Sequence, residues 1–134
     1  MKITRSGMLG VKRGAADYFT GAVWLEDLAG GVAAKLRALR VSFEPGARTA
    51  WHTHPHGQLL NIVSGVARVQ KSGEPVIELF PGDVVWFEPG ERHWHGAAPD
   101  RPMVHVAVQE TDEAGNAAHW LEQVSDADYR GAAK

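Results

Sequence analysis

Hydrophobic residues in this chain come in short runs rich in β-branched and aromatic side chains, and glycine or proline separates one run from the next. Runs of about five residues with this composition are typical of β-strands. Turn sequences such as Glu44-Pro45-Gly46 and Phe80-Pro81-Gly82 stand between them. The pattern predicts strands at residues 39–43, 59–63, 66–69, 76–79, 84–87 and 103–108. We therefore expect an all-β sandwich or barrel.

Two segments lie outside this pattern. Residues 33–39 fit either a helical turn or the approach to a strand, and periodicity alone leaves both open. Near the carboxyl end, Ser125 precedes Asp126 and Asp128, which is the arrangement of an N-cap serine with acidic residues in the first helical turn. A short C-terminal helix is predicted there.

Length and composition limit the class of protein. We expect one domain over residues 1–134, with its core at about 37–110. The net charge of -2 provides no basic field for nucleic acid, and no stretch approaches the roughly 20 apolar residues of a membrane span. A soluble, cytoplasmic protein is the expectation. Cysteine is absent, so a bound metal would need histidine, carboxylate, amide or water ligands.

Histidines are concentrated where the predicted strands are densest, because six of the seven lie between residues 52 and 105. Residues i and i+2 of a strand point to the same face, so His52 and His54 project together, and so do His93 and His95. One such pair alone is more often a surface feature, but two pairs on strands beside glycine turns indicate a metal site. We expect His56 in an exposed turn.

The same parity argument divides the last predicted strand into two faces. One face carries Met103, His105, Ala107 and Gln109, and the other carries Val104, Val106 and Val108. We expect the valine face to pack in the core, so the other face needs a reason to hold histidine and glutamine. Elsewhere, we expect Trp51, Trp86 and Trp94 between the sheets and His119 on the surface.

These spacings resemble the two sequence motifs of the cupin superfamily. The first runs from Gly46 through His52-Thr53-His54 to Gln58 and Gly65, with five, three and six residues between them. The second runs from Gly82 through Pro89-Gly90 to His93, without the residue that usually separates the proline from the glycine. The resemblance implies a small jelly-roll β-barrel in which His52, His54, Gln58 and His93 surround a divalent metal.

Gln58 stands where the general motif has glutamate. An amide oxygen adds no charge, so a bound ion keeps its full positive charge and is a stronger Lewis acid. The site also lacks the two-histidine, one-carboxylate set that suits ferrous oxygenases. This substitution favours chemistry other than oxygen activation.

A longer similarity covers most of the chain. Residues 16–21, 44–55, 82–87 and 89–99 resemble bacterial single-domain cupins that include manganese-dependent hydroxynitrile lyases. This resemblance implies a reversible cleavage of cyanohydrins to aldehyde and cyanide, with Thr49, His95 and His105 as catalytic residues. His105 would be the base, while His95 and Thr49 would bond the leaving cyanide. Gln109 and Val41 would shape the substrate pocket.

Other functions and partners remain open at this stage. The metal is expected to be Mn²⁺, with Fe²⁺, Zn²⁺, Ni²⁺ and Co²⁺ as alternatives. A similar site also suits isomerisation or ring opening of sugar acids, and a non-catalytic cupin would only bind a small molecule. We expect a homodimer or homotetramer, because cupins commonly pair chains and residues 2–5 would serve as an exchanged strand.

Overall fold

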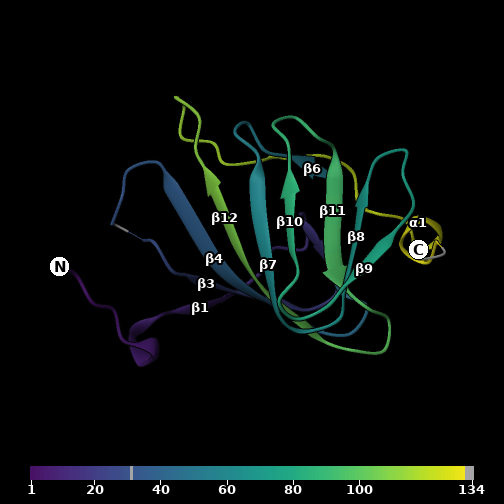
Figure 1. Cartoon of the computed structure of the whole chain (residues 1–134), viewed down its shortest axis with the longest axis horizontal. Coiled ribbons are helices and arrows are strands. Elements are labelled where there is room, and N and C mark those ends of the chain that lie inside the picture. Colours follow the sequence, from purple (N-terminus) through teal and green to yellow (C-terminus); the bar gives the residue numbers. More distant parts are fainter. Residues whose placement is uncertain (31, 132–134) are drawn as a thin grey trace.

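Two antiparallel sheets face each other in the computed structural model, which describes residues 1–30 and 32–131 (Figure 1). The first sheet has six strands in the order β1-β3-β4-β12-β7-β10. The second has seven, with β13-β6-β11-β5-β2 in a row, β8 paired with β11, and β9 paired with β8. The expected all-β jelly-roll architecture is confirmed.

The elements follow one another closely along the chain. They are η1 (Ser6–Met8), β1 (Val11–Arg13), β2 (Phe19–Thr20), β3 (Val23–Asp27), β4 (Leu36–Phe43), β5 (Arg48–Thr49), β6 (His52–Thr53), β7 (Gln58–Gly65), β8 (Ala67–Lys71), β9 (Ile77–Leu79), β10 (Val84–Phe87), β11 (His93–Ala97), β12 (Met103–Glu110), β13 (His119–Trp120) and α1 (Asp126–Tyr129). Among the described residues, no helix has the length and apolar character needed to cross a membrane.

All six predicted strands are present with small shifts at their ends. The ambiguous stretch at 33–39 resolves as the approach to a strand, since β4 begins at Leu36. The predicted C-terminal helix is also confirmed, because the Ser125 side chain accepts a hydrogen bond from the Asp128 backbone nitrogen at 3.1 Å. Residues 2–5 form no strand within this single chain.

The core lies between the inward faces of the two sheets. Its larger cluster is Val23, Val41, Phe43, Ala47, Ile62, Ala67, Ala97 and Met103. Leu60, Val69, Phe87 and Ala107 form a neighbouring one. A third cluster includes Trp51, Trp94 and Tyr129, so α1 covers the outer face of the second sheet.

Two expectations about burial are wrong. On β12 the face with Met103, His105, Ala107 and Gln109 is the buried one, whereas Val104, Val106 and Val108 are only half-buried on the outer face. Trp86 lies on the outer face of β10 and is 48% exposed, and Trp51 and Trp94 belong to the cluster under α1 rather than to the space between the sheets. Parity shows which residues share a face, but it does not show which face turns inward.

Gly65 explains why the first motif ends in glycine. Its φ is +77°, and a Cβ atom there would lie 1.8 Å from the carbonyl oxygen of Pro102. Only glycine combines this left-handed conformation with such a close approach to another main chain. The position lets β7 turn beside the start of β12, which aligns the two strands that carry Gln58 and His105.

Candidate metal centre

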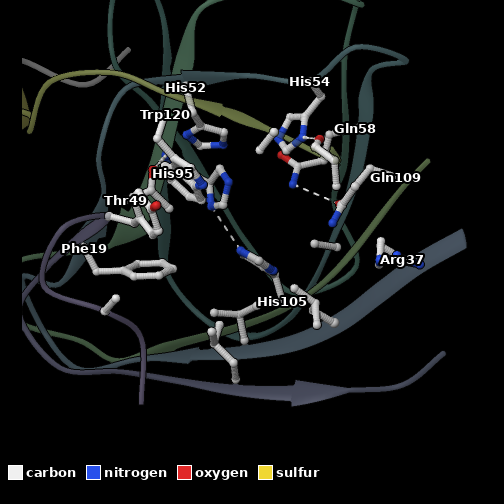
Figure 2. A pocket seen from close by; sticks show the side chains of 18 of the residues that line it. Phe19, Arg37, Thr49, His52, His54, Gln58, His95, His105, Gln109 and Trp120 are labelled. Carbon is white, nitrogen blue, oxygen red and sulfur yellow. Dashed lines mark hydrogen bonds between the residues drawn. The ribbon is translucent and has the colours of Figure 1, made fainter. Parts of the chain in front are cut away.

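A cavity of about 640 Å³ opens between the two sheets and is lined by residues of both (Figure 2). The second sheet and its connections contribute Thr49 from β5, His52 from β6, His54 from the following turn, and His95 from β11. The first sheet contributes Val41 from β4, Gln58 from β7, and His105 and Gln109 from β12. His93 of β11 lies behind Gln58, in contact with its amide oxygen. All nine of these residues are buried.

The histidines meet at one end of this cavity. The ring centroid of His52 lies 4.3 Å from that of His93 and 4.9 Å from that of His54. Ligand atoms of His52, His93 and His95 all lie within 4.8 Å of one another. The structure therefore brings together both histidine pairs, including His95, which the resemblance places among the catalytic residues. His56 and His119 are exposed, as expected, and line no part of the cavity.

Main-chain carbonyls fix the tautomer of three of these rings. Nδ1 of His52 bonds to the Ala50 carbonyl at 2.9 Å, Nδ1 of His54 to Ala117 at 2.8 Å, and Nδ1 of His93 to Glu91 at 2.9 Å. A carbonyl oxygen can only accept, so each Nδ1 carries the proton and each Nε2 keeps its lone pair. This is the usual outer contact of a metal-binding histidine.

The Gln58 amide supports the same interpretation. Its oxygen lies 3.2 Å from Nε2 of His93, while its nitrogen donates to the Gln109 side-chain oxygen at 3.2 Å. Nε2 of His93 and the Gln58 oxygen each point a lone pair toward the other, so no hydrogen lies between these two atoms. Two donors bound about 2.1 Å from one ion at right angles would be about 3.0 Å apart. The separation fits a shared cation.

Burial keeps the imidazoles neutral in the protein. It lowers the pKa of His93 and of His105 to about 3. It also lowers the pKa of His52 and His95 well below their usual value, with repulsion from neighbouring histidines as a further cause. Neutral rings are the form in which histidine binds metals. The buried Nε2 atom of His54 has no partner among the described residues, which leaves it available as a ligand.

His95 and His105 form a second, separate contact. Nε2 of His105 and Nδ1 of His95 are 3.1 Å apart and share one hydrogen bond, drawn as a dashed line in Figure 2. The Thr49 side-chain oxygen accepts a bond from the His95 backbone nitrogen at 3.2 Å. His95 thus differs from the other three histidines of the cluster, because its Nδ1 contacts another side chain rather than a carbonyl.

Aromatic residues that the sequence did not indicate complete one wall of the cavity. Trp120 lies opposite His52 in the β13–β6 pair, and their ring centroids are 4.7 Å apart. Tyr18 stacks on Trp120 at 4.6 Å, and Phe19 lies 5.9 Å from it. These residues are far from the two motifs in sequence, and only the pairing of two-residue strands brings them to the site.

Comparisons with known proteins agree with this geometry. The family model described as "Cupin domain" matches residues 39–109. The chain is 50% identical over 131 residues to a protein of Granulicella tundricola named (R)-mandelonitrile lyase, which covers 97% of this chain and 99% of the relative.

Solved structures extend the likeness. A cupin-like protein from Thermotoga maritima is 42% identical, with a TM-score of 0.81 over 88% of this chain and 90% of that chain. The polyketide cyclase RemF from Streptomyces resistomycificus shares the fold, with a TM-score of 0.71 at 15% identity over 96% of this chain and 90% of the other. The motifs, the barrel and these matches together show that the chain belongs to the cupin family.

Proposed function

We propose that this protein is a metal-dependent lyase that cleaves the carbon–carbon bond of cyanohydrins and releases an aldehyde and cyanide. The observation that carries the proposal is the 50% identity to the (R)-mandelonitrile lyase over 97% of the chain. The cavity of about 640 Å³ has the size of a small-molecule site and combines apolar walls with a few polar groups. An enzyme with a small-molecule substrate agrees with both features.

The metal ligands in this proposal are His52, His54, Gln58 and His93, and the ion is Mn²⁺. Each of the three histidines donates its Nδ1 proton to a main-chain carbonyl, whereas Nδ1 of His95 contacts His105 instead. A bound divalent ion would supply positive charge that lowers the pKa of a substrate hydroxyl group and stabilises its alkoxide. Gln58 would leave that charge undiminished, because its amide is neutral.

In this proposal His95 and His105 together remove the proton from the substrate hydroxyl group. His95 Nε2 takes the hydroxyl proton while the proton on His95 Nδ1 passes to Nε2 of His105 at 3.1 Å. Because burial favours the neutral rings, the extra proton then leaves with cyanide as hydrogen cyanide. The bond between the carbinol carbon and the nitrile carbon breaks, cyanide leaves with the electron pair, and the aldehyde forms. The Thr49 hydroxyl group accepts from the His95 backbone nitrogen, so its own hydrogen can bond the departing cyanide.

One experiment tests the metal and the reaction together. The purified protein is analysed for metal content, reloaded with Mn²⁺, Fe²⁺, Co²⁺, Ni²⁺ or Zn²⁺, and assayed for benzaldehyde release from mandelonitrile. We expect His54→Ala to lose both the metal and the activity. His56→Ala, which removes an exposed histidine two residues away, is the matched control and should keep both. A metal-free protein that cleaves mandelonitrile, or a loaded one that does not, would contradict the proposal.

A further inference from the structure

Positive charge is concentrated at the rim of the cavity. Lys12 and Arg13 of β1 and Arg37 of β4 line it, whereas no aspartate or glutamate does among the described residues that form its wall. This distribution is opposite to that of the whole chain, whose net charge is -2. The histidines deeper inside are neutral, so the rim provides the fixed charge that a ligand meets.

Arg37 is available for a ligand. The only hydrogen bonds of its side chain among the described residues run from Nη1 to the carbonyls of Leu36 and Ala34, at 3.1 and 3.5 Å. None of the ion pairs of the described chain includes Arg37, Lys12 or Arg13. The ion pair closest to it in sequence joins Lys35, two residues before Arg37, to Glu113 at 4.0 Å. A guanidinium group without a carboxylate partner, on the inward face of β4, has room for an anion.

Gln109 provides a second donor at the same place. It is the partner of Arg37 in the β4–β12 register, and Figure 2 shows the two side chains on the side of the pocket away from Phe19. Its oxygen accepts from the Gln58 nitrogen at 3.2 Å, and its own nitrogen makes no hydrogen bond among the described residues. A carboxylate between Arg37 and this nitrogen would accept from both, directly beside the proposed metal ligand Gln58.

We propose that Arg37 and the Gln109 amide nitrogen form a carboxylate-binding subsite, and that the preferred substrates are carbonyl compounds or cyanohydrins carrying a carboxylate. The carboxylate would lie at the rim while the reacting carbon lies near the histidines. The inference rests on the proposed function only in placing a carbonyl compound in this cavity. It adds a charge preference that mandelonitrile, a neutral molecule, does not use.

The test compares two probes of closely similar shape, one with a carboxylate and one with a neutral amide in its place. Calorimetric titration of the metal-loaded protein measures the Kd of 4-formylbenzoate and of the neutral 4-formylbenzamide. We expect the carboxylate to bind at least about tenfold more tightly, because charge-assisted hydrogen bonds are stronger than neutral ones. Arg37→Gln should bring the ratio close to one. Arg101→Gln removes the same charge from an exposed position outside the cavity and should leave the ratio unchanged.

The outcomes separate this inference from the lyase proposal. Equal binding of the two probes by the unmodified protein, or a ratio that survives Arg37→Gln, overturns the subsite. If Arg37→Gln does not fold, Arg37→Lys replaces it. Lysine keeps the charge but lacks the forked guanidinium donor, so the ratio of the two Kd values should fall; an unchanged ratio overturns the subsite. Mandelonitrile cleavage is measured on the same samples. Cleavage without a charge preference refutes only the subsite, and a charge preference without cleavage refutes only the lyase.

Discussion

Replacing His105 by leucine separates a catalytic role from a structural one. His105 is 1% exposed and makes one side-chain hydrogen bond, at 3.1 Å to His95, while its Nδ1 is buried without a partner among the described residues. Removing that unpaired nitrogen stabilises the fold by about 1–3 kcal/mol, and leaving His95 Nδ1 unpaired costs about the same. An apolar side chain of similar volume adds less than about 1.5 kcal/mol of misfit. The free energy of unfolding should therefore change by no more than about 1.5 kcal/mol.

Met103→Ala is the matched control on the same face of β12. Met103 is also 1% exposed but belongs to the apolar core, so its truncation should cost about 2–5 kcal/mol. Denaturant unfolding of both variants measures these values. Benzaldehyde release should fall by about 10²–10⁴-fold for His105→Leu, as expected on loss of a general base, and stay normal for the folded Met103→Ala protein.

Two results would refute this reasoning. A loss of more than about 3 kcal/mol for His105→Leu, in the range of a large core truncation, would make His105 a structural residue. A joint loss of metal content and activity would show that His105 maintains the metal ligands rather than accepting the proton. Metal analysis of the variant distinguishes the second result from the first.

Three further predictions concern the fold and its assembly. Gly65→Ala should prevent folding at 37 °C, whereas Gly73→Ala, with φ +84° but nothing within 4 Å, should lower the free energy of unfolding by only about 1 kcal/mol; similar unfolding curves would contradict this. Trp86→Lys should convert a homodimer, formed through the apolar outer face of the first sheet, into a monomer in sedimentation experiments; an unmodified protein that is already monomeric would exclude that dimer. Asp126 has a pKa lowered from its usual 3.8 by the Arg48 hydrogen bond, so its contribution exists above that pH and disappears as the carboxyl protonates. Asp126→Asn should lower the Tm at pH 6, and the difference should disappear as the pH falls through the lowered pKa of Asp126; a pH-independent difference would refute the assignment.

The strands of the middle region could be predicted because their local composition and turns agree with the final structure. The parity of β11 and β12 is an example, since it needs no knowledge of the partner strand. By contrast, the sequence did not predict β1 to β3, β5, β6 and β13, because strands of two or three residues carry almost no periodic signal and β3, with five, lies outside the region of dense turns. Trp86 was placed wrongly because an apolar residue on an outer face looks the same in sequence as one in the core.

At the candidate metal centre, sequence spacing predicts which histidines lie together but not which ring nitrogen carries the proton. Parity pairs His52 with His54 and His93 with His95, whereas Gln58 joins the expected ligands only through the resemblance to the cupin motifs. The histidine pairs could be predicted in this way. Their protonation could not, because it depends on the carbonyls of Ala50, Glu91 and Ala117, and the last of these lies 63 residues beyond His54.

These carbonyls carry a consequence for the chemistry. Three rings have their Nδ1 protons held by main chain, so their Nε2 lone pairs are oriented before any ion binds. In His95, by contrast, Nδ1 contacts another histidine, so the hydrogen between His95 and His105 can transfer from one ring to the other without breaking a main-chain hydrogen bond. The same cluster therefore combines three pre-oriented nitrogen lone pairs, which could hold a cation, with one hydrogen that can move between two rings. A site that only held a metal would have no need of the movable proton, and this difference is the structural argument for catalysis rather than for binding alone.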